Sequence, residues 1–204
     1  MPRPDVSEER RPQIVEAAIK VFLRKGYRKA TMPDVAREAG LSIGGVYWYF
    51  KGKDEIVMDI LEQVFQSDLD DLNQLLGSDA PTAERVRTYV EQYVKHYDDY
   101  AWLDPVGIQF YAESTHDPKV RKFIREYLSH YRQVLVTLIE QGIRRGEFRL
   151  VAARPLEVAN SILGLEEGLS MLAVADPQNV RWKEAFQTSI ELILTGLTKK
   201  ETEK

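Results

Sequence analysis

The chain has 204 residues, of which 44% are hydrophobic and 29% are charged, a composition typical of a globular protein with a buried core. It contains no cysteine, which excludes disulfide frameworks, thiol catalysis and thiolate metal sites and fits a reducing compartment. The N-terminal residues lack a signal-peptide apolar region, and no apolar run approaches the roughly 18 residues that a membrane span needs. We therefore expect a cytoplasmic protein without a membrane segment.

The net charge of −4 is unevenly distributed along the chain. Residues 1–53 contain 11 lysines and arginines against 6 acidic residues, whereas residues 54–204 contain 17 against 26. A basic region can face a polyanion, and an acidic region repels one. We therefore expect two domains with separate roles, a basic one over 1–53 and an acidic one over 54–204.

The first predicted helix is amphipathic. Within RPQIVEAAIKVFLRKG, apolar residues recur at the spacing of one helical face, at Ile14, Ala17, Ala18, Val21 and Phe22. Pro12 suits the first helical turn, and Gly26 suits the position just after the last turn. This predicts a helix of about four turns that buries one face.

Two short helices are predicted between residues 31 and 50. Thr31 can cap the first, which ends at Gly40, and Ser42 can cap the second, which carries the sequence IGGVYWYF. Several apolar residues are placed to pack against the first helix: Ala36, Leu41, Val46 and Phe50. The three helices have the spacing of a helix-turn-helix unit, whose second short helix enters the DNA major groove.

The rest of the chain is predicted to be helical with short breaks. A long helix begins near Lys53, and helical patterns then cover 84–100, 105–113, 118–145, 154–174 and 178–198. Strand-like alternation never persists. The predicted fold is all-α, with an N-terminal three-helix helix-turn-helix domain followed by a larger helical bundle for ligand binding and dimerisation.

The surface of the second short helix that would face DNA consists of Ser42, Ile43, Gly44, Gly45, Tyr47 and Trp48. Gly44 and Gly45 each cost about 1 kcal/mol in a helix relative to alanine, and they permit close approach of another surface. Tyr47 offers a hydroxyl to a phosphate, and Trp48 offers an N–H and a flat ring to a base edge. A plain helical hairpin with core aromatics is the alternative, but these two adjacent rings are difficult to bury together.

The stretch 11–60 resembles the TetR family of bacterial transcriptional regulators. The features that carry the resemblance are the VAREAGLS turn, the aromatic cluster at 47–50, and several single positions, namely Phe22, Gly26, Tyr27, Thr31 and Lys53. By position, the resemblance implies phosphate contacts from Thr31, Tyr47 and Lys53. It implies base contacts from Ser42, Ile43, Gly44, Gly45 and Trp48.

The chain departs from the family pattern at two of these positions. Ile43 stands where family members often carry a polar or basic residue, and Gly45 stands where they often carry threonine. Fewer hydrogen-bonding side chains therefore face the bases. We expect readout to rely on apolar contact, on Trp48 and on DNA shape.

The resemblance also implies a mechanism. The expected protein is a homodimeric repressor that binds a palindromic operator in double-stranded DNA and is released by a small-molecule effector. An activator, or a repressor strengthened by its ligand, is compatible with the same sequence. Rivals from other classes are a helical small-molecule binder or enzyme and an interaction adaptor, each with a purely structural N-terminal unit.

Aromatic residues crowd the middle of the chain and suggest an effector site. Tyr89, Tyr93 and Tyr97 recur every four residues, and a second group on another helix does the same. Such stripes also fit a core or an interface, although each buried hydroxyl needs a partner. The candidate ligand-binding residues are Tyr89, Tyr93, Trp102, Phe110, Glu113, Tyr127 and Glu167. The rings predict a largely apolar or aromatic effector, and a carboxylate buried among them would favour a lipophilic cation.

The last two predicted helices are candidates for dimerisation. Asn160, Gly164 and Gly168 recur every four residues and would let another helix approach closely, although close packing within one chain explains them equally well. The final helix carries an apolar face that includes Phe186, Ile190 and Leu194. The resemblance implies that these two helices pair in a four-helix dimer interface.

Catalytic signatures are missing from the sequence. The three histidines are isolated, and no metal-binding HExxH, GxSxG elbow or phosphate loop is present. We therefore expect no cofactor, no metal and no enzyme activity.

Overall fold

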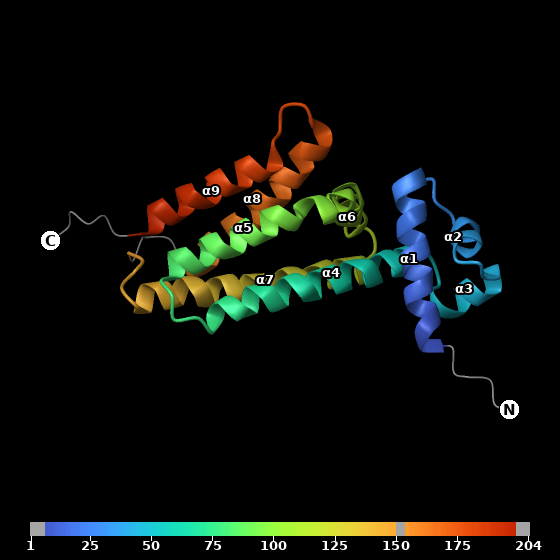
Figure 1. Ribbon diagram of the computed structural model, residues 1–204, viewed down its shortest axis with the longest axis horizontal. Helices are drawn as coiled ribbons and strands as arrows, with labels where there is room; N and C mark the ends of the chain where they lie inside the picture. The colour runs from blue at the N-terminus through green and yellow to red at the C-terminus, as the bar shows by residue number, and fades with distance from the viewer. Residues whose placement is uncertain (1–6, 150–153, 199–204) are drawn as a thin grey trace. The chain divides into compact units, whose positions relative to one another are not determined.

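The computed structural model describes residues 7–149 and 154–198 and is all-α over these ranges, as predicted (Figure 1). The helices, in chain order, are α1 (Ser7–Lys25), α2 (Met32–Glu38), α3 (Ile43–Tyr49), α4 (Lys53–Leu76), α5 (Thr82–Tyr100), the 3-10 turn η1 (Ala101–Leu103), α6 (Asp104–Glu113), α7 (Pro118–Arg144), α8 (Pro155–Ala175) and α9 (Trp182–Leu197).

The chain divides into two compact units within α4. Unit 1 extends to Gln66, and unit 2 begins at Ser67. The division therefore lies later than the boundary after Lys53 that the charge distribution suggested. Since α4 is a single helix, its first part packs in unit 1 and its second part in unit 2.

Unit 1 is built on the apolar face predicted for α1. Ile14, Ala18 and Val21 are buried on that face, and Val46 and Phe50 of the α3 segment are buried in the same unit. Gly26 and Gly40 adopt positive φ angles of 74° and 65°, which glycine tolerates and which ends the helices before them.

The start of α1 was predicted too late. The helix begins at Ser7, so Pro12 lies inside it and not in its first turn. A proline at this point removes one backbone hydrogen bond and is normally unfavourable. The helix nevertheless continues beyond Pro12, because the apolar face from Ile14 onward is buried in unit 1 and this packing outweighs the lost hydrogen bond.

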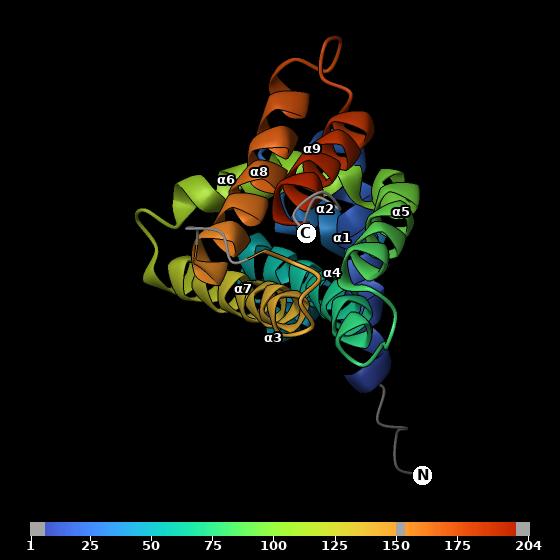
Figure 2. The ribbon, with the colours of Figure 1, turned by 90° about the vertical axis from the view of Figure 1, so that its left-hand side faces the viewer.

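In unit 2, the helices α5, α7, α8 and α9 run side by side in both views (Figures 1 and 2). One cluster of buried side chains lies between α5 and α9 and includes Val90, Val94, Trp182 and Phe186. A second lies between the end of α4 and α7 and includes Leu72, Val134 and Leu138. The α9 helix begins four residues later than predicted, because Asp176 and Asn179 close a turn through backbone and side-chain hydrogen bonds.

By length and composition alone, α8 is apolar enough to cross a membrane, contrary to the expectation that no segment approaches this threshold. A single such helix is weak evidence of a membrane span. The helix also carries Glu166 and Glu167, which face tyrosines inside unit 2.

Candidate DNA-recognition and effector sites

The outer face of α3 carries exposed aromatic and apolar side chains, while its inner face is buried. Trp48 is 79% exposed, Ile43 46% and Tyr47 43%, whereas Val46 on the opposite side is fully buried. Exposed rings of this size are unusual on a globular surface, and an apolar patch generally marks a contact with a partner. The positions predicted to face DNA therefore lie on one accessible helix face.

The two short helices of unit 1 are capped as predicted. The Asp34 backbone N–H donates a hydrogen bond of 3.3 Å to Thr31 Oγ1, while the Asp34 carboxylate accepts from the Thr31 backbone N–H, which completes a capping box. The Gly45 N–H donates to Ser42 Oγ at 3.1 Å. Both residues are exposed, and the Thr31 hydroxyl also donates to the Asp34 carboxylate at 2.8 Å. The phosphate contact predicted for Thr31 would compete with that bond, and the base contact predicted for Ser42 remains a prediction.

The glycines of α3 leave its outer face unobstructed. A Cβ added to Gly44 would meet no neighbouring atom, and one added to Gly45 would lie 3.2 Å from Ser42 Oγ. Glycine is thus not required for packing at position 44. The open space at this position is compatible with the predicted close approach of an external surface.

Lys53 has an internal role that the sequence did not reveal. Its ammonium donates to the carbonyl oxygen of Tyr27 at 2.8 Å and to those of Arg28 and Ala30 at 3.3 Å, and it lies 4.5 Å from the centre of the Tyr27 ring. These contacts hold the α1–α2 loop. Partial burial lowers the Lys53 pKa. The predicted phosphate contact would either add to these hydrogen bonds or require Lys53 to give up one of them.

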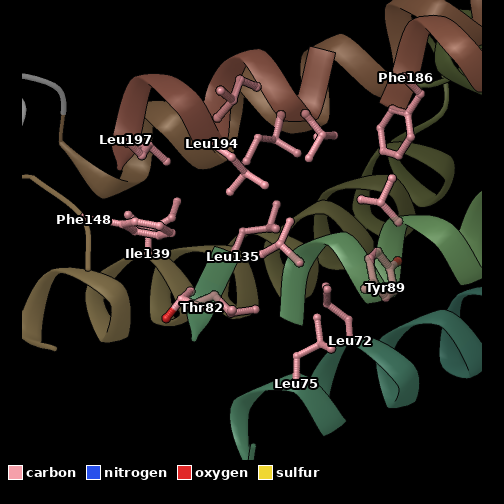
Figure 3. A pocket seen from close by; sticks show the side chains of 16 residues that line it. Leu72, Leu75, Thr82, Tyr89, Leu135, Ile139, Phe148, Phe186, Leu194 and Leu197 are labelled. Carbon is pink, nitrogen blue, oxygen red and sulfur yellow. The ribbon is translucent and has the colours of Figure 1, made fainter. Parts of the chain in front are cut away.

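An apolar cavity of about 70 Å³ lies inside unit 2 (Figure 3). Leucine, isoleucine and valine side chains from α4, α5, α7, α8 and α9 form most of its wall. Tyr89 and Phe186 lie toward one end in Figure 3, and Phe148 and Leu197 lie toward the other. Enclosed apolar space of this kind is typical of ligand sites.

A second feature of unit 2, which we call the carboxyl–tyrosine cluster, shares Tyr89 with the cavity wall. It consists of four largely buried carboxyl groups and six tyrosines from five helices, namely Asp68, Asp104, Glu166, Glu167, Tyr89, Tyr93, Tyr97, Tyr111, Tyr127 and Tyr131. The Tyr93 hydroxyl donates to Glu166 at 2.9 Å, the Tyr111 hydroxyl to Glu167 at 2.5 Å, and the Tyr97 hydroxyl to Asp104 at 2.5 Å.

The electrostatics of this cluster are those of uncompensated acids. Burial, followed by the neighbouring Glu167 carboxylate, raises the Glu166 pKa to about 8, and burial raises the Asp68 pKa to about 6. Burial likewise raises the pKa of Asp104 and of Glu167. Over the described ranges, no lysine, arginine or histidine forms an ion pair with any of the four.

The structure brings together only part of the predicted ligand site. The cluster contains four of the predicted residues, Tyr89, Tyr93, Tyr127 and Glu167. Phe110 is buried on α6 and directly precedes Tyr111 of the cluster in the sequence. Trp102 is half-buried in η1, without a described contact to the cluster. Glu113 lies outside the cluster: its side chain is exposed at the end of α6, where its backbone carbonyl accepts the N–H groups of His116 and Asp117.

Sequence reasoning missed Asp68, which looked like one of several surface acids in QSDLDDL. The signal was present, since Asp68 follows Leu61 by seven residues and precedes Leu72 by four, so it falls on the apolar stripe of α4. An acid on a buried face is a candidate functional residue.

The predicted dimerisation residues separate into two groups. Asn160 and Gly164 are exposed, Gly168 is partly exposed, and both glycines have open space where a side chain would stand. Phe186, Ile190 and Leu194 are instead buried and line the apolar cavity, so they cannot present side chains to a second chain. On α9 the exposed apolar residue is Leu192, at 69%. The sequence pattern predicted correctly which residues form the apolar face of α9. That face packs inside unit 2, whereas the prediction had it face a second chain.

No three acidic or histidine side chains of the described part of the chain converge closely enough to hold a metal ion. A helix-turn-helix unit with an exposed recognition face, joined to a helical unit with an internal cavity, defines a class of protein: DNA-binding regulators that respond to small molecules.

Comparison with known proteins agrees with this class. Residues 14–60 match the bacterial regulatory proteins of the TetR family, and residues 81–195 match the C-terminal region of BetI-type transcriptional repressors. The uncharacterised HTH-type transcriptional regulator YfiR of Bacillus subtilis is 29% identical over 164 residues, which cover 79% of this chain and 78% of that protein.

Solved structures share the fold over nearly the whole chain. A TetR transcription regulator from Haloarcula marismortui superposes with a TM-score of 0.81 at 18% identity, covering 94% of this chain and all of that one. A Saccharomonospora viridis protein in complex with choline superposes with a TM-score of 0.78 at 23% identity, covering 95% of this chain and 100% of that one. The chain belongs to the TetR family of bacterial transcriptional regulators. It is a ligand-responsive DNA-binding protein and not an enzyme.

Proposed function

We propose that this protein is a homodimeric repressor that binds a palindromic operator through α3 and leaves it when a small molecule enters unit 2. The observation that carries the DNA-binding part is the α3 face. Trp48 and Tyr47 are exposed side by side on a helix whose inner residue, Val46, is fully buried. Burial of Val46 fixes the orientation of α3, and the two exposed rings do not contribute to the core.

A second copy of the chain is required for specific DNA binding. One helix-turn-helix unit makes few base contacts, so such proteins pair over two half-sites about 34–36 Å apart. Exposed apolar side chains on α8 and α9 supply a surface for pairing: Met171, Leu172, Val174 and Leu192. Gly164, which lies on the same helix as three of them, leaves room for close approach of a partner helix.

The effector acts by differential affinity for two arrangements of the dimer. α4 begins in unit 1, and its later residues include Leu72 and Leu75 of the cavity wall and Asp68 of the carboxyl–tyrosine cluster. A ligand that binds better to one position of α4 shifts the population toward that position. A coupling of about 2–3 kcal/mol would weaken operator binding by roughly 30- to 150-fold.

The test is a selection of purified protein against random-sequence duplex DNA, followed by titration of the enriched site at several salt concentrations. We expect an enriched palindrome bound by two chains, with affinity that falls steeply as salt rises, because phosphate contacts release counterions. An enriched site without dyad symmetry, or a single chain on each duplex, would overturn the dimeric assignment. Absence of enrichment even at low salt would overturn operator binding by the free protein.

A further inference from the structure

The ammonium group of Lys53 is occupied inside unit 1. An ammonium carries three N–H bonds, all of them donors. Its nitrogen lies 2.8 Å from the carbonyl oxygen of Tyr27 and 3.3 Å from those of Arg28 and Ala30, and the centre of the Tyr27 ring lies 4.5 Å away. The three carbonyls thus match the three N–H bonds. A DNA phosphate at Lys53 would therefore compete with a carbonyl that already holds one of these bonds.

The three carbonyls belong to the α1–α2 loop, residues 26–31, which is held by the start of α4. The Tyr27 hydroxyl donates to the carboxylate of Asp54, the residue directly after Lys53, and the Tyr27 ring packs edge-on against Phe22 of α1 at 5.6 Å between ring centres. Within the loop, the Ala30 N–H donates to the Gly26 carbonyl at 3.1 Å. Lys53 therefore fixes the path of a loop that lies 23 to 26 positions earlier in the chain.

The same loop carries two cations that are not engaged in ion pairs. The basic residues around the start of α2 are Arg24, Lys25, Arg28, Lys29 and Arg37. Three of them pair with acids of α2: Arg24 with Glu38, and Lys25 and Arg37 with Asp34. Arg28 and Lys29 are exposed, and within the described ranges their side chains form neither an ion pair nor a hydrogen bond. Their charges remain available to a polyanion.

The position of this pair distinguishes it from other solvated charges on the surface. The loop leads directly into Thr31, the cap of α2, and α2 packs against both α1 and α3. The backbone that carries Arg28 and Lys29 is thus fixed relative to the exposed face of α3. Cations on a fixed backbone beside a recognition helix are suited to hold phosphates, which orient the helix while its side chains contact the bases.

We propose that Arg28 and Lys29 are the phosphate ligands of the α1–α2 loop and that Lys53 is a positioning residue, whose ammonium holds the loop carbonyls so that the two cations face the operator backbone. This inference rests on the proposed operator binding. Within it, the phosphate contact expected of Lys53 is transferred to two residues for which neither the sequence pattern nor the resemblance implied a role.

The first experiment is titration of the full-length protein with the selected operator, followed by fluorescence anisotropy at several salt concentrations. Each phosphate contact contributes about 0.9 to the slope of log K against log salt, so Arg28→Gln and Lys29→Gln are each expected to lower the slope by about 1.8 in a complex of two chains. Lys20→Gln is the matched control, since Lys20 is an exposed lysine of α1 paired with Glu16 on its own helix. Slopes that neither Arg28→Gln nor Lys29→Gln changes would overturn the assignment of the ligands.

A double-mutant cycle tests the role of Lys53. Lys53→Met removes the ammonium and keeps the aliphatic stem. We expect it to weaken operator binding about tenfold in the wild-type background but only about twofold in the Arg28→Gln/Lys29→Gln background, because residues that act together are not additive. A direct phosphate ligand would instead cost the same in both backgrounds and would lower the salt slope further in the second. That result would overturn the positioning role.

A measurement without DNA keeps the positioning role testable on its own. In the free full-length protein, Lys53→Met is expected to speed amide hydrogen exchange at Ala30 about tenfold, because the loop that closes its hydrogen bond to Gly26 is released. Exchange at Val46 of α3 should stay unchanged, which shows that unit 1 is still folded. Arg28→Gln should leave exchange at Ala30 unaltered. Wild-type exchange at Ala30 in Lys53→Met would overturn the positioning role.

The outcomes separate this inference from the proposed function. Absence of any enriched operator contradicts the proposed function, and hydrogen exchange at Ala30 still decides whether Lys53 positions the loop. An operator that is bound with a steep salt dependence, unaffected by Arg28→Gln and Lys29→Gln, contradicts this inference and leaves the repressor function standing.

Discussion

Gly142 on α7 lies directly against the ring of Phe148, so a Cβ at position 142 would stand 2.6 Å from Cε2 and 2.9 Å from Cγ of that ring. The Gly142 carbonyl also accepts the backbone N–H groups of Glu147 and Phe148, at 2.9 Å and 3.0 Å. The turn after α7 thus folds back over its own helix and delivers Phe148 to the end wall of the apolar cavity.

The first prediction concerns this contact. Gly142→Ala is expected to destabilise the protein by about 1–3 kcal/mol, because the added Cβ overlaps the buried Phe148 ring and forces the ring or the α7 backbone to shift. Urea unfolding followed by circular dichroism measures the change. Gly107→Ala on α6 is the control, since its Cβ would meet no neighbouring atom and alanine favours helix by up to about 1 kcal/mol. A Gly142→Ala protein as stable as the wild type would show that Phe148 is not held as described.

The second prediction is a fall in stability as pH rises above neutrality. The Glu166 pKa has an ordinary value of 4.5 and rises to about 8 in the fold. Between these two pH values, the folded protein keeps a proton on Glu166 that the unfolded chain has released. Stability therefore decreases with rising pH through this window. The loss between about pH 6 and about pH 8.5 should be on the order of 2 kcal/mol, since one pKa unit corresponds to about 1.4 kcal/mol.

Glu166→Gln isolates the contribution of this group to the pH dependence. The variant carries no titrating proton at this position, so its stability should change less over the same pH range and should exceed that of the wild type near pH 8.5. Thermal unfolding at several pH values provides the comparison. Identical pH profiles for the two proteins would mean that the Glu166 carboxyl is ionised and solvated in the fold.

The third prediction concerns the DNA-facing rings of α3. Trp48→Ala is expected to weaken operator binding roughly ten- to hundredfold, the effect of losing a base contact, without loss of stability, because the ring is 79% exposed. Fluorescence anisotropy with the selected operator measures affinity, and circular dichroism monitors the fold. Leu23→Ala removes another large exposed side chain from unit 1, outside α2 and α3, and should leave DNA affinity unchanged.

The two functional surfaces differed in how far the sequence could predict them. The helix ends of unit 1 at these positions were predicted correctly, because Thr31, Ser42 and the glycines at 26 and 40 act locally and their roles follow from capping and turn chemistry. The effector site depends on contacts between distant helices. Asp68 and Tyr131 are 63 positions apart, so helical periodicity along each segment could not show that they meet.

The final helix illustrates a different limit. An amphipathic pattern shows which residues share a face, but it does not show whether that face meets its own chain or a second one. Phe186, Ile190 and Leu194 share a face as predicted, and that face is filled by unit 2 itself. The apolar residues left exposed for a partner are Met171, Leu172 and Val174 on α8 and Leu192 on α9.

The fourth prediction tests that remaining surface. Leu192→Glu is expected to convert the dimer to monomers in sedimentation velocity experiments without loss of helix content, because a charge at the centre of an apolar interface is costly to bury and harmless in water. Operator binding should fall with dimerisation. Gly164→Ala provides a finer probe: alanine should stabilise an isolated helix by up to about 1 kcal/mol, yet weaken the dimer if a partner helix packs against position 164. A Leu192→Glu protein that remains dimeric would place the interface elsewhere on unit 2.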